Sequence, residues 1–437
     1  MRPAMGRRKN VQTVFGFSRH FSGTRQCASY PEPGLTEGVQ NDGMGMTSRD
    51  IRLLGLVAFA SMASMRMCDP MLVQWALDFD VSQGQASHVI AAFAIAYGLM
   101  QLVYGPLGQR LGNVRLVTWA AGISAILSVL TALSTGLEAL AGVRTAMGAI
   151  AACIIPLSMA WIGDKVSYEH RQQTLARLMS ATVTGLMAGQ WFGGFAAQYL
   201  GWRWAFAALA LLFALASVLL YTSDMYQNFQ PKTGQASVTA VMYLKETWTL
   251  LEQSHIQKVL LLTLLEGAFA FGAMVFVPSV LIKDFGLNAS SAGAAMLLYG
   301  VGGLMYSQFA KHWLKLCGEG GLAKAGGCLI AAGLALLLWS DQLAGALLAC
   351  FVTGLGLYML HNVLQTQATQ MAPHNRSTAV TLFASVLFLG QSGGVLALSL
   401  CLDANWLRPS LALVAVGIAV VGFFVSKQSP GTSPPIN

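Results

Sequence analysis

Long apolar runs, repeated along almost the whole chain, constrain its fold more than any other feature. After Arg52 the sequence contains twelve mostly apolar runs of about 20 residues, the length that an α-helix needs to cross the hydrocarbon core of a bilayer. We therefore predict transmembrane helices at residues 53–75, 86–106, 114–134, 138–162, 175–199, 203–222, 257–282, 289–312, 322–340, 343–370, 377–401 and 406–426.

The composition excludes a soluble protein. Of the 437 residues, 55% are hydrophobic and only 10% are charged, whereas soluble domains carry about 25% charged residues. The net charge of +8 does not predict a nucleic-acid partner, because the basic residues are not gathered on one polar domain. The sequence also lacks a P-loop, an HExxH motif, and a GxSxG motif between a strand and a helix. This excludes the common enzyme classes and ATP-driven transport.

Basic residues predict the orientation of the chain in the membrane. With the N-terminus inside, the outer loops hold only Arg203, Lys283 and Arg408, and the other loop cations lie on the cytoplasmic side. Because Lys and Arg are enriched in cytoplasmic loops, both termini are predicted to be cytoplasmic.

The first 50 residues differ from the rest. Residues 1–31 contain six basic residues and no acidic one. Three interpretations are open: a disordered cytoplasmic tail, an Arg-rich transit peptide, or a segment that is not translated, with Met44 or Met46 as the true start. We favour the first or the third.

The longest loop predicts a division into two bundles. Residues 223–256 separate the sixth and seventh predicted spans, and their second part is expected to form an amphipathic helix at the cytoplasmic surface. The predicted parts are a tail (1–50), an N-terminal six-helix bundle (51–222), the central loop (223–256), a C-terminal six-helix bundle (257–426) and a second tail (427–437).

The sequences of the two predicted bundles resemble each other. Tyr97-Gly98 corresponds to Tyr299-Gly300 at an offset of 202 residues, and GQWFGG at 189–194 corresponds to GQSGG at 390–394 at an offset of 201. The fold class we predict is an all-α membrane protein with two six-helix pseudo-repeats. Transporters built from such parallel repeats bind their substrate near the midplane, between the repeats.

A Gly-rich basic turn, YGPLGQRLGNVRLV, joins the second and third predicted spans. A tight turn held in the cytoplasm by its arginines accounts for most of this pattern. The turn also resembles the signature loop of the Major Facilitator Superfamily, roughly G-x-L-(A/G)-D-R-x-G-R-(R/K). The residues that match are Gly105, Leu107, Gly108, Arg110 and Gly112. Gln109 replaces the family's Asp, which takes part in a cytoplasmic charge lock, so the resemblance implies a weaker lock here.

Two further motifs resemble the proton-coupled antiporter branch of that family. RTAMGAIAA carries Arg144, Gly148 and Ala152 of R-x-x-x-G-x-x-x-A. In GLMAGQWFGG, which resembles G-x-x-x-G-P-x-x-G-G, Gln190 replaces Pro and the residues that match are Gly185, Gly189, Gly193 and Gly194. Arg144 has two interpretations. It is either an arginine that reaches the outer interface or a buried cation that acts on a nearby carboxylate.

Together the motifs cover about residues 50–426 and most resemble twelve-span drug:proton antiporters and bacterial sugar- and metabolite-efflux relatives. The resemblance implies a monomeric secondary transporter in the bacterial inner membrane, with a small-molecule substrate and no cofactor besides the proton as coupling ion. Proton-coupled efflux by alternating access is the function we expect. The alternative is an importer or an uncoupled facilitator. A non-transporting sensor or scaffold is disfavoured, because it would have little reason to carry intramembrane charges.

Three polar residues stand out in the first and seventh predicted spans. Arg66 and Asp69, three apart, share a helix face and are expected to pair, either as a structural pair or as part of a cavity lining. Asp69 precedes Pro70, so its helix is expected to be irregular. Glu266 is the only acid in its run. It is either a proton carrier or a glutamate near the cytoplasmic end that faces water.

A polar cluster marks the tenth predicted span. His361, Asn362 and Gln365 belong to it, and the histidine is either a titrating group or a hydrogen-bonded packing residue. Tyr97 and Trp191 lie deeper in their spans than the other large aromatics, so they are candidates for contact with substrate. No metal site is expected, because the cluster lacks a second His or acid and none of the seven cysteines forms a CxxC pair.

Overall fold

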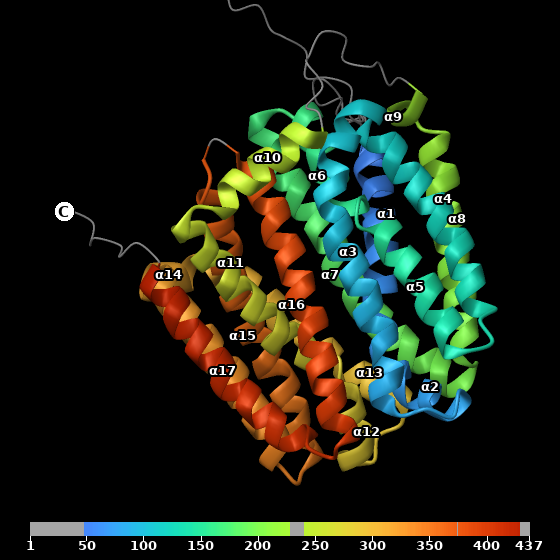
Figure 1. The fold of residues 1–437 in the computed structure, drawn as a ribbon, viewed down its shortest axis with the longest axis vertical. Helices are drawn as coiled ribbons and strands as arrows, with labels where there is room; N and C mark the ends of the chain where they lie inside the picture. The colour runs from blue at the N-terminus through green and yellow to red at the C-terminus, as the bar shows by residue number, and fades with distance from the viewer. Residues whose placement is uncertain (1–47, 228–239, 374, 429–437) are drawn as a thin grey trace, which may run out of the picture. The chain divides into compact units, whose positions relative to one another are not determined.

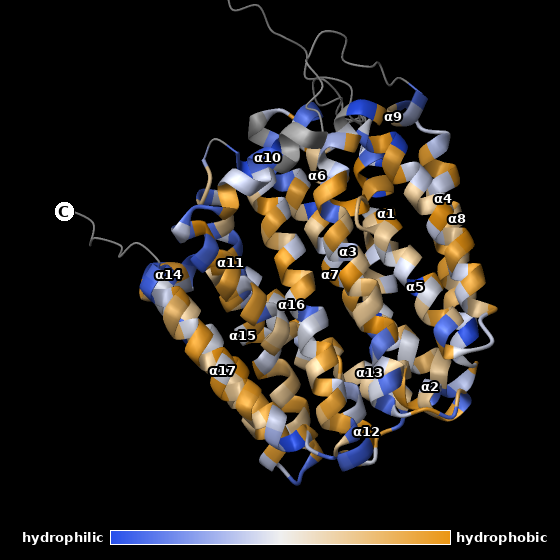
Figure 2. Ribbon diagram, in the orientation of Figure 1, coloured by the Kyte–Doolittle hydropathy of each residue, from blue (hydrophilic) through white to orange (hydrophobic). Residues whose placement is uncertain are grey.

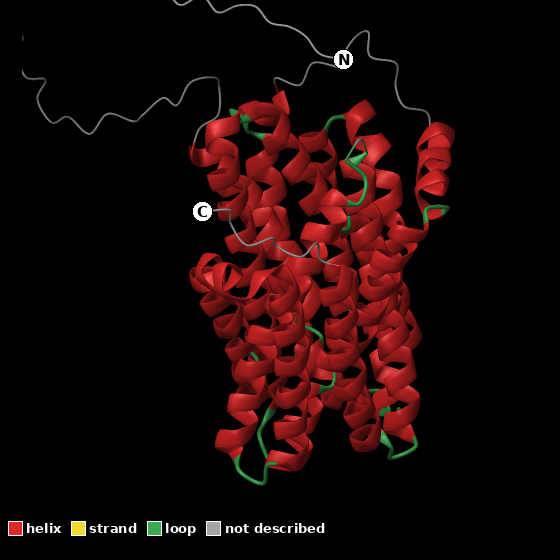
Figure 3. Cartoon of the chain, turned by 90° about the vertical axis from the view of Figure 1, so that its left-hand side faces the viewer, coloured by secondary structure: helices red, strands yellow, loops and turns green. Residues whose placement is uncertain are grey.

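The computed structural model describes residues 48–227, 240–373 and 375–428; the side chains at 109, 168, 169 and 240–244 are not described. These parts of the chain are almost entirely helical and contain no strand (Figure 3). Most of the predicted tails and residues 228–239 of the central loop lie outside the described residues. The bounds 51–222 and 257–426 of the two bundles remain a prediction.

The helices follow one another along the chain with short connections (Figure 1). Residues 48–227 form α1 (Ser48–Arg66), η1 (Asp69–Met71), α2 (Leu72–Asp78), α3 (Gln83–Leu111), α4 (Asn113–Ala132), α5 (Leu137–Ala151), α6 (Ile154–Lys165), α7 (Tyr168–Tyr199), α8 (Trp202–Tyr221) and α9 (Asp224–Gln227). Residues 240–428 form α10 (Ala240–Leu251), α11 (Ser254–Glu266), η2 (Gly267–Gly272), α12 (Val277–Phe285), α13 (Ala289–Ala295), α14 (Leu297–Trp339), α15 (Leu343–Gln370), α16 (Arg376–Asp403) and α17 (Leu407–Gln428).

Each predicted span falls on one of these helices or on an interrupted pair of them. Among the described residues, ten helical segments are long and apolar enough to cross a membrane. The count is below twelve for two reasons. The polar and small residues of α7 make it less apolar than the ten segments. The eighth and ninth spans are counted together as one segment, Ala289–Trp339. Apolar residues run along the helices and hydrophilic ones gather at both ends, as Figure 2 shows.

One predicted loop is shorter than expected. Within residues 313–321, expected to separate the eighth and ninth spans, only Gly318 leaves the helical conformation. The chain turns there through a kink at Gly318, whose φ of 65° is a conformation that glycine adopts at little cost. The helix expected in the second part of the central loop is α10.

The signature turn is shorter than its sequence suggests. Gly112 alone separates α3 from α4, and its φ of 91° lies in the region that favours glycine. A side chain at Gly108 would meet Leu157 and Asn113. Gly108 and Gly112 therefore let the two helix ends approach closely.

The first and seventh spans are interrupted at corresponding places. In the first span, a short 3₁₀ turn that contains Pro70 follows α1, because proline cannot supply the amide that a continuous helix needs. In the seventh span, a π-helical turn, η2, follows Glu266 directly. π-helical turns widen a helix locally and are frequent at functional sites. Both interruptions lie next to a predicted site residue.

The internal repeat is visible in the packing of glycines on backbone carbonyls. A Cβ at Gly189 would overlap the carbonyl of Ala63, and one at Gly390 would overlap the carbonyl of Leu264. Gly193 on Met67 and Gly394 on Ala268 repeat the relationship. Each of these second-half residues lies 201 positions after its counterpart in the first half. Thus α7 packs on α1 as α16 packs on α11 and η2.

We call α1 to α8 the first half and α11 to α17 the second half. Their contacts lie toward the end of the bundle that carries the loops after α2, α7, α12 and α16. There α3 runs beside α16, and α7 runs beside α13 and the start of α14. Near the other end, which holds the basic loops, α10 touches both α3 and α16. We call these two ends the latch end and the basic end.

Candidate functional site

A buried ion pair lies where the first span is interrupted. The Arg66 guanidinium lies 3.4 Å from Asp69 Oδ2, as the spacing predicted, and both side chains are almost fully buried. The Gln190 amide of α7 donates to the same oxygen at 3.1 Å. Gln190 reaches Asp69 because the glycines on either side of it bring α7 against α1. The acid thus has partners on two helices.

Arg144 is the second buried cation of the first half. Its side chain is 1% exposed, which rules out an arginine that reaches the interface. It donates to the Ser64 hydroxyl and to the Ser64 carbonyl, each at 3.0 Å. Its guanidinium carbon lies 4.2 Å from the centre of the Phe93 ring. Its partner Ser64 lies two residues before Arg66 on α1. The interpretation as a buried cation is therefore the one that the geometry favours.

Glu266 and His361 form the corresponding pair in the second half. His361 Nδ1 lies 3.2 Å from Glu266 Oε2. The glutamate is fully buried at the end of α11, which rules out a side chain that merely faces water, and the histidine on α15 is 23% exposed. The histidine ring also contacts Phe383 and Phe271. A buried acid therefore lies behind a partly exposed base.

The ring of Phe271 connects the two pairs. Its centre lies 5.7 Å from the Arg66 guanidinium carbon of the first half. It also lies 5.4 Å from the His361 ring of the second half, in an edge-on arrangement. Phe271 belongs to η2, so the π-helical turn places an aromatic side chain between the ionisable groups of the two halves.

Each carboxyl group keeps one oxygen without a donor. Asp69 Oδ1 and Glu266 Oε1 are buried and have no hydrogen-bond partner among the described residues. An unpaired buried oxygen is costly when the carboxyl is charged and less so when it carries a proton. Among the same residues, no group of three His, Cys, Asp or Glu side chains gathers into a possible metal site.

Comparison with known families decides what kind of protein has this arrangement. Residues 54–397 match the model of the Major Facilitator Superfamily. The chain belongs to this superfamily. It is therefore a multi-pass membrane transporter and not an enzyme.

Relatives within the superfamily are distant. The chain is 25% identical to the uncharacterized MFS-type transporter YceJ of Bacillus subtilis, over 75% of this chain and 83% of YceJ. It is 28% identical to the multidrug export protein EmrB of Haemophilus influenzae, over 35% of this chain and 30% of EmrB. A crystal structure of a mutant of the nucleoside transporter NupG, 14% identical, superposes with a TM-score of 0.70 over 87% of this chain and 99% of that one. The likeness to NupG supports the superfamily fold alone.

Two of the superfamily motifs lie at the end of α3 and along α7. Of the signature loop, Arg110 is exposed at the end of α3, Gly105 lies within that helix, and the side chain of Gln109 is not described. In α7, Gly185 and its neighbours Gly189 and Gly193 pack on α1. Gly194 instead meets Ala289 of the second half, so α7 has glycine contacts with both halves.

The remaining aromatic and polar candidates lie on α3, α7 and α15. Tyr97 is buried between the halves, with its ring centre 4.5 Å from that of Phe388. Trp191 is exposed and contacts Phe195, one turn further along α7. On α15, Asn362 and Gln365 are exposed. Asn362 also lines a small pocket between α14 and α15.

Sequence reasoning missed the residues that link the candidates. Phe271, Ser64 and Phe93 carry no signal of their own in an apolar run. The pairing of Glu266 with His361 was also missed, because 95 residues separate them and spacing predicts only contacts within one helix.

Proposed function

We propose that this protein is a proton-coupled secondary transporter that exports a small organic molecule by alternating access. The observation that carries the proposal is the pair of Glu266 and His361, a fully buried acid beside a partly exposed base. Intramembrane acids are costly and persist where they serve transport. The corresponding position of the first half is Met65, so this acid is not part of the repeated scaffold.

In the proposed cycle, His361 mediates proton exchange with Glu266. The exposed edge of the imidazole takes up a proton, and its Nδ1 faces the glutamate. When the proton passes from Nδ1 to Glu266, both groups become neutral, the charge attraction between them ends, and the ring is free to move against Phe271. Phe271 also contacts Arg66, so a change at the acid of one half reaches a cation of the other.

Export is the direction that we favour, on the partial similarity to the multidrug export protein EmrB and on the glycines of α7. Import is the second candidate. The observation in its favour is Gln190, which stands where the antiporter motif has Pro and bonds to Asp69 instead of bending α7. We further propose the bacterial inner membrane as the location, on the strength of bacterial relatives such as YceJ, with both termini cytoplasmic.

The test uses purified protein in proteoliposomes with an imposed pH gradient and an internal pH dye. Lipophilic cations, sugars and organic acids are added one at a time. We expect substrate-dependent proton movement in the wild type and none in Glu266→Gln, which keeps the shape of the side chain but cannot exchange a proton. Glu319→Gln, at the kink region of α14, is the matched control and should behave like the wild type.

Two results would overturn the proposal. Proton-driven accumulation at the wild-type rate by Glu266→Gln would remove this acid from the mechanism. Equal substrate flux with and without a pH gradient would instead indicate an uncoupled facilitator.

A further inference from the structure

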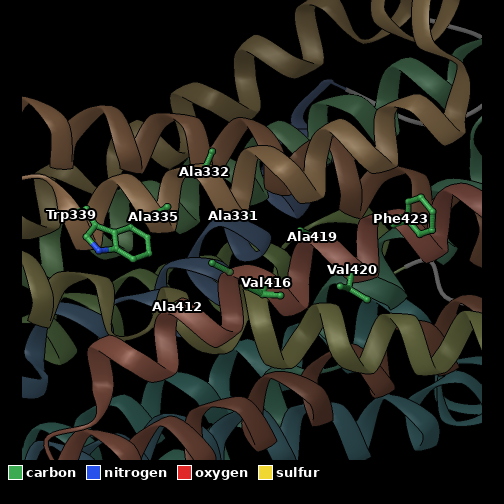
Figure 4. Close-up of a pocket in the computed structure, with 10 residues that line it drawn as sticks. Ala331, Ala332, Ala335, Trp339, Ala412, Val416, Ala419, Val420 and Phe423 are labelled. Atoms are coloured by element: carbon green, nitrogen blue, oxygen red, sulfur yellow. The ribbon is translucent and has the colours of Figure 1, made fainter.

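A groove on the outside of the second half begins where two helices touch through glycines. A Cβ at Gly327 of α14 would come within 3.0 Å of Gly422 of α17, so the two backbones are in contact there. Toward the latch end, side chains of both helices line an open space. The space between them is open to the surroundings and forms a groove, shown in Figure 4.

Small apolar side chains line this groove along its whole length. Phe423 lies at one end and Trp339 at the other, and the residues between them are Ala331, Ala332, Ala335, Ala412, Ala415, Val416, Ala419 and Val420. From Ala412 to Phe423 the helix rises by about 16 Å at 1.5 Å per residue. One leaflet of the hydrocarbon core is about 15 Å thick. The groove therefore matches one acyl chain in length.

Two lysines lie at the basic end of the groove. Lys324 Nζ is 5.3 Å and Lys427 Nζ is 4.6 Å from the centre of the same Phe423 ring. No carboxylate of the described residues lies within salt-bridge distance of either ammonium group. Two like charges held on one ring repel each other, and an anion between them would remove that repulsion.

We infer that this groove binds one acyl chain of an anionic phospholipid, whose phosphate lies between Lys324 and Lys427. The apolar floor accepts the chain, and the two ammonium groups select a negative headgroup over a zwitterionic one. Phe423 contributes to both parts, because its ring holds the lysines and closes the groove. The inference does not depend on the substrate or on proton coupling.

Native mass spectrometry of the purified full chain tests the inference. The probes are palmitoyl-oleoyl phosphatidylglycerol and palmitoyl-oleoyl phosphatidylcholine, which share their acyl chains and differ in charge. Two lysines near a membrane surface are expected to favour the anionic lipid by about 30-fold in affinity. The double variant Lys324→Gln/Lys427→Gln should lose most of this preference. Lys311→Gln, a lysine outside the groove, should keep it.

A second variant separates the groove from the headgroup site. Ala332→Leu/Ala335→Leu fills the groove without changing charge, and it should weaken the binding of phosphatidylglycerol. Ala146→Leu, on the exposed face of α5, is its control. Equal retention of both lipids by the wild type would overturn the inference. So would unchanged retention of phosphatidylglycerol by either double variant, or a dimer of the chain that forms on this face without lipid.

Discussion

The carboxylate of Asp403, at the end of α16, accepts a hydrogen bond from the Ser82 hydroxyl at 2.7 Å, and Ser82 caps the start of α3. The same carboxylate accepts from the Gly84 amide at 3.1 Å. A negative group at a helix N-terminus is stabilised by the unpaired amides and by the helix dipole. Asp403 therefore joins the second half to the first at the latch end.

Asp403→Asn should weaken this junction and increase the population in which the latch end is open. The asparagine keeps the size of the side chain but loses the charge that the α3 N-terminus favours. Distances between spin labels at Leu77 and Trp406, one on each half, would measure the change by electron paramagnetic resonance. Asp284→Asn neutralises an acid at the same end that pairs within the second half, with Arg408, and should leave the distances unchanged. An identical distribution in Asp403→Asn and the wild type would contradict the prediction.

Gln109→Asp should shift the same equilibrium from the other end of the molecule. The superfamily resemblance assigns this position to a charge lock at the basic end, so an added carboxylate should favour closure there and opening at the latch end. The spin-label distances at Leu77 and Trp406 should therefore lengthen. Gln109→Asn keeps the position uncharged and serves as the control. The prediction is wrong if the aspartate and asparagine variants give the same distances.

Phe271→Leu should reduce the coupling between substrate and proton without unfolding the protein. Leucine fills much of the same volume but lacks the ring face that contacts Arg66 and His361. The number of protons moved per substrate in proteoliposomes should fall. Phe269→Leu, on the same π-helical turn, is a control for the loss of an aromatic ring from η2. Wild-type stoichiometry in Phe271→Leu would show that the ring is only a packing residue.

Gly189→Ala and Gly390→Ala should each destabilise the fold by about 1–3 kcal/mol, because the added methyl group would overlap a backbone carbonyl that cannot move alone. Gly393→Ala is the matched control, since nothing lies within 4 Å of its added Cβ, and alanine is the better helix former. Unfolding at increasing concentrations of a denaturing detergent, monitored by circular dichroism, would rank the stabilities of the variants. Equal loss at positions 390 and 393 would contradict the packing argument.

The helices and one ion pair were predictable from the sequence because their causes are local. Apolar runs of membrane length define the spans, and a spacing of three residues places Arg66 beside Asp69. Pro70 predicted the interruption of the first span. The break after Glu266 was not predicted, because glycine and phenylalanine in an apolar run are compatible with an unbroken helix.

The contacts between helices could not be predicted from the sequence. Glu266 meets His361, Gln190 meets Asp69, and Asp403 meets Ser82 only because distant segments pack side by side. The break between the eighth and ninth spans was predicted, but its length was not. The predicted loop there contains several glycines, and only the packing decides that Gly318 alone leaves the helical conformation.

The repeated glycine contacts have a consequence for how this chain can change in evolution. The backbone framework is the same in both halves, yet Asp69 corresponds to Ala270 and Glu266 corresponds to Met65. Each acid thus occurs in one copy of the framework and not in the other. Two copies of one framework can specialise in this way, each with an acid that the other lacks. A chimaera with two identical halves could then keep the architecture but would lose one of the two acids.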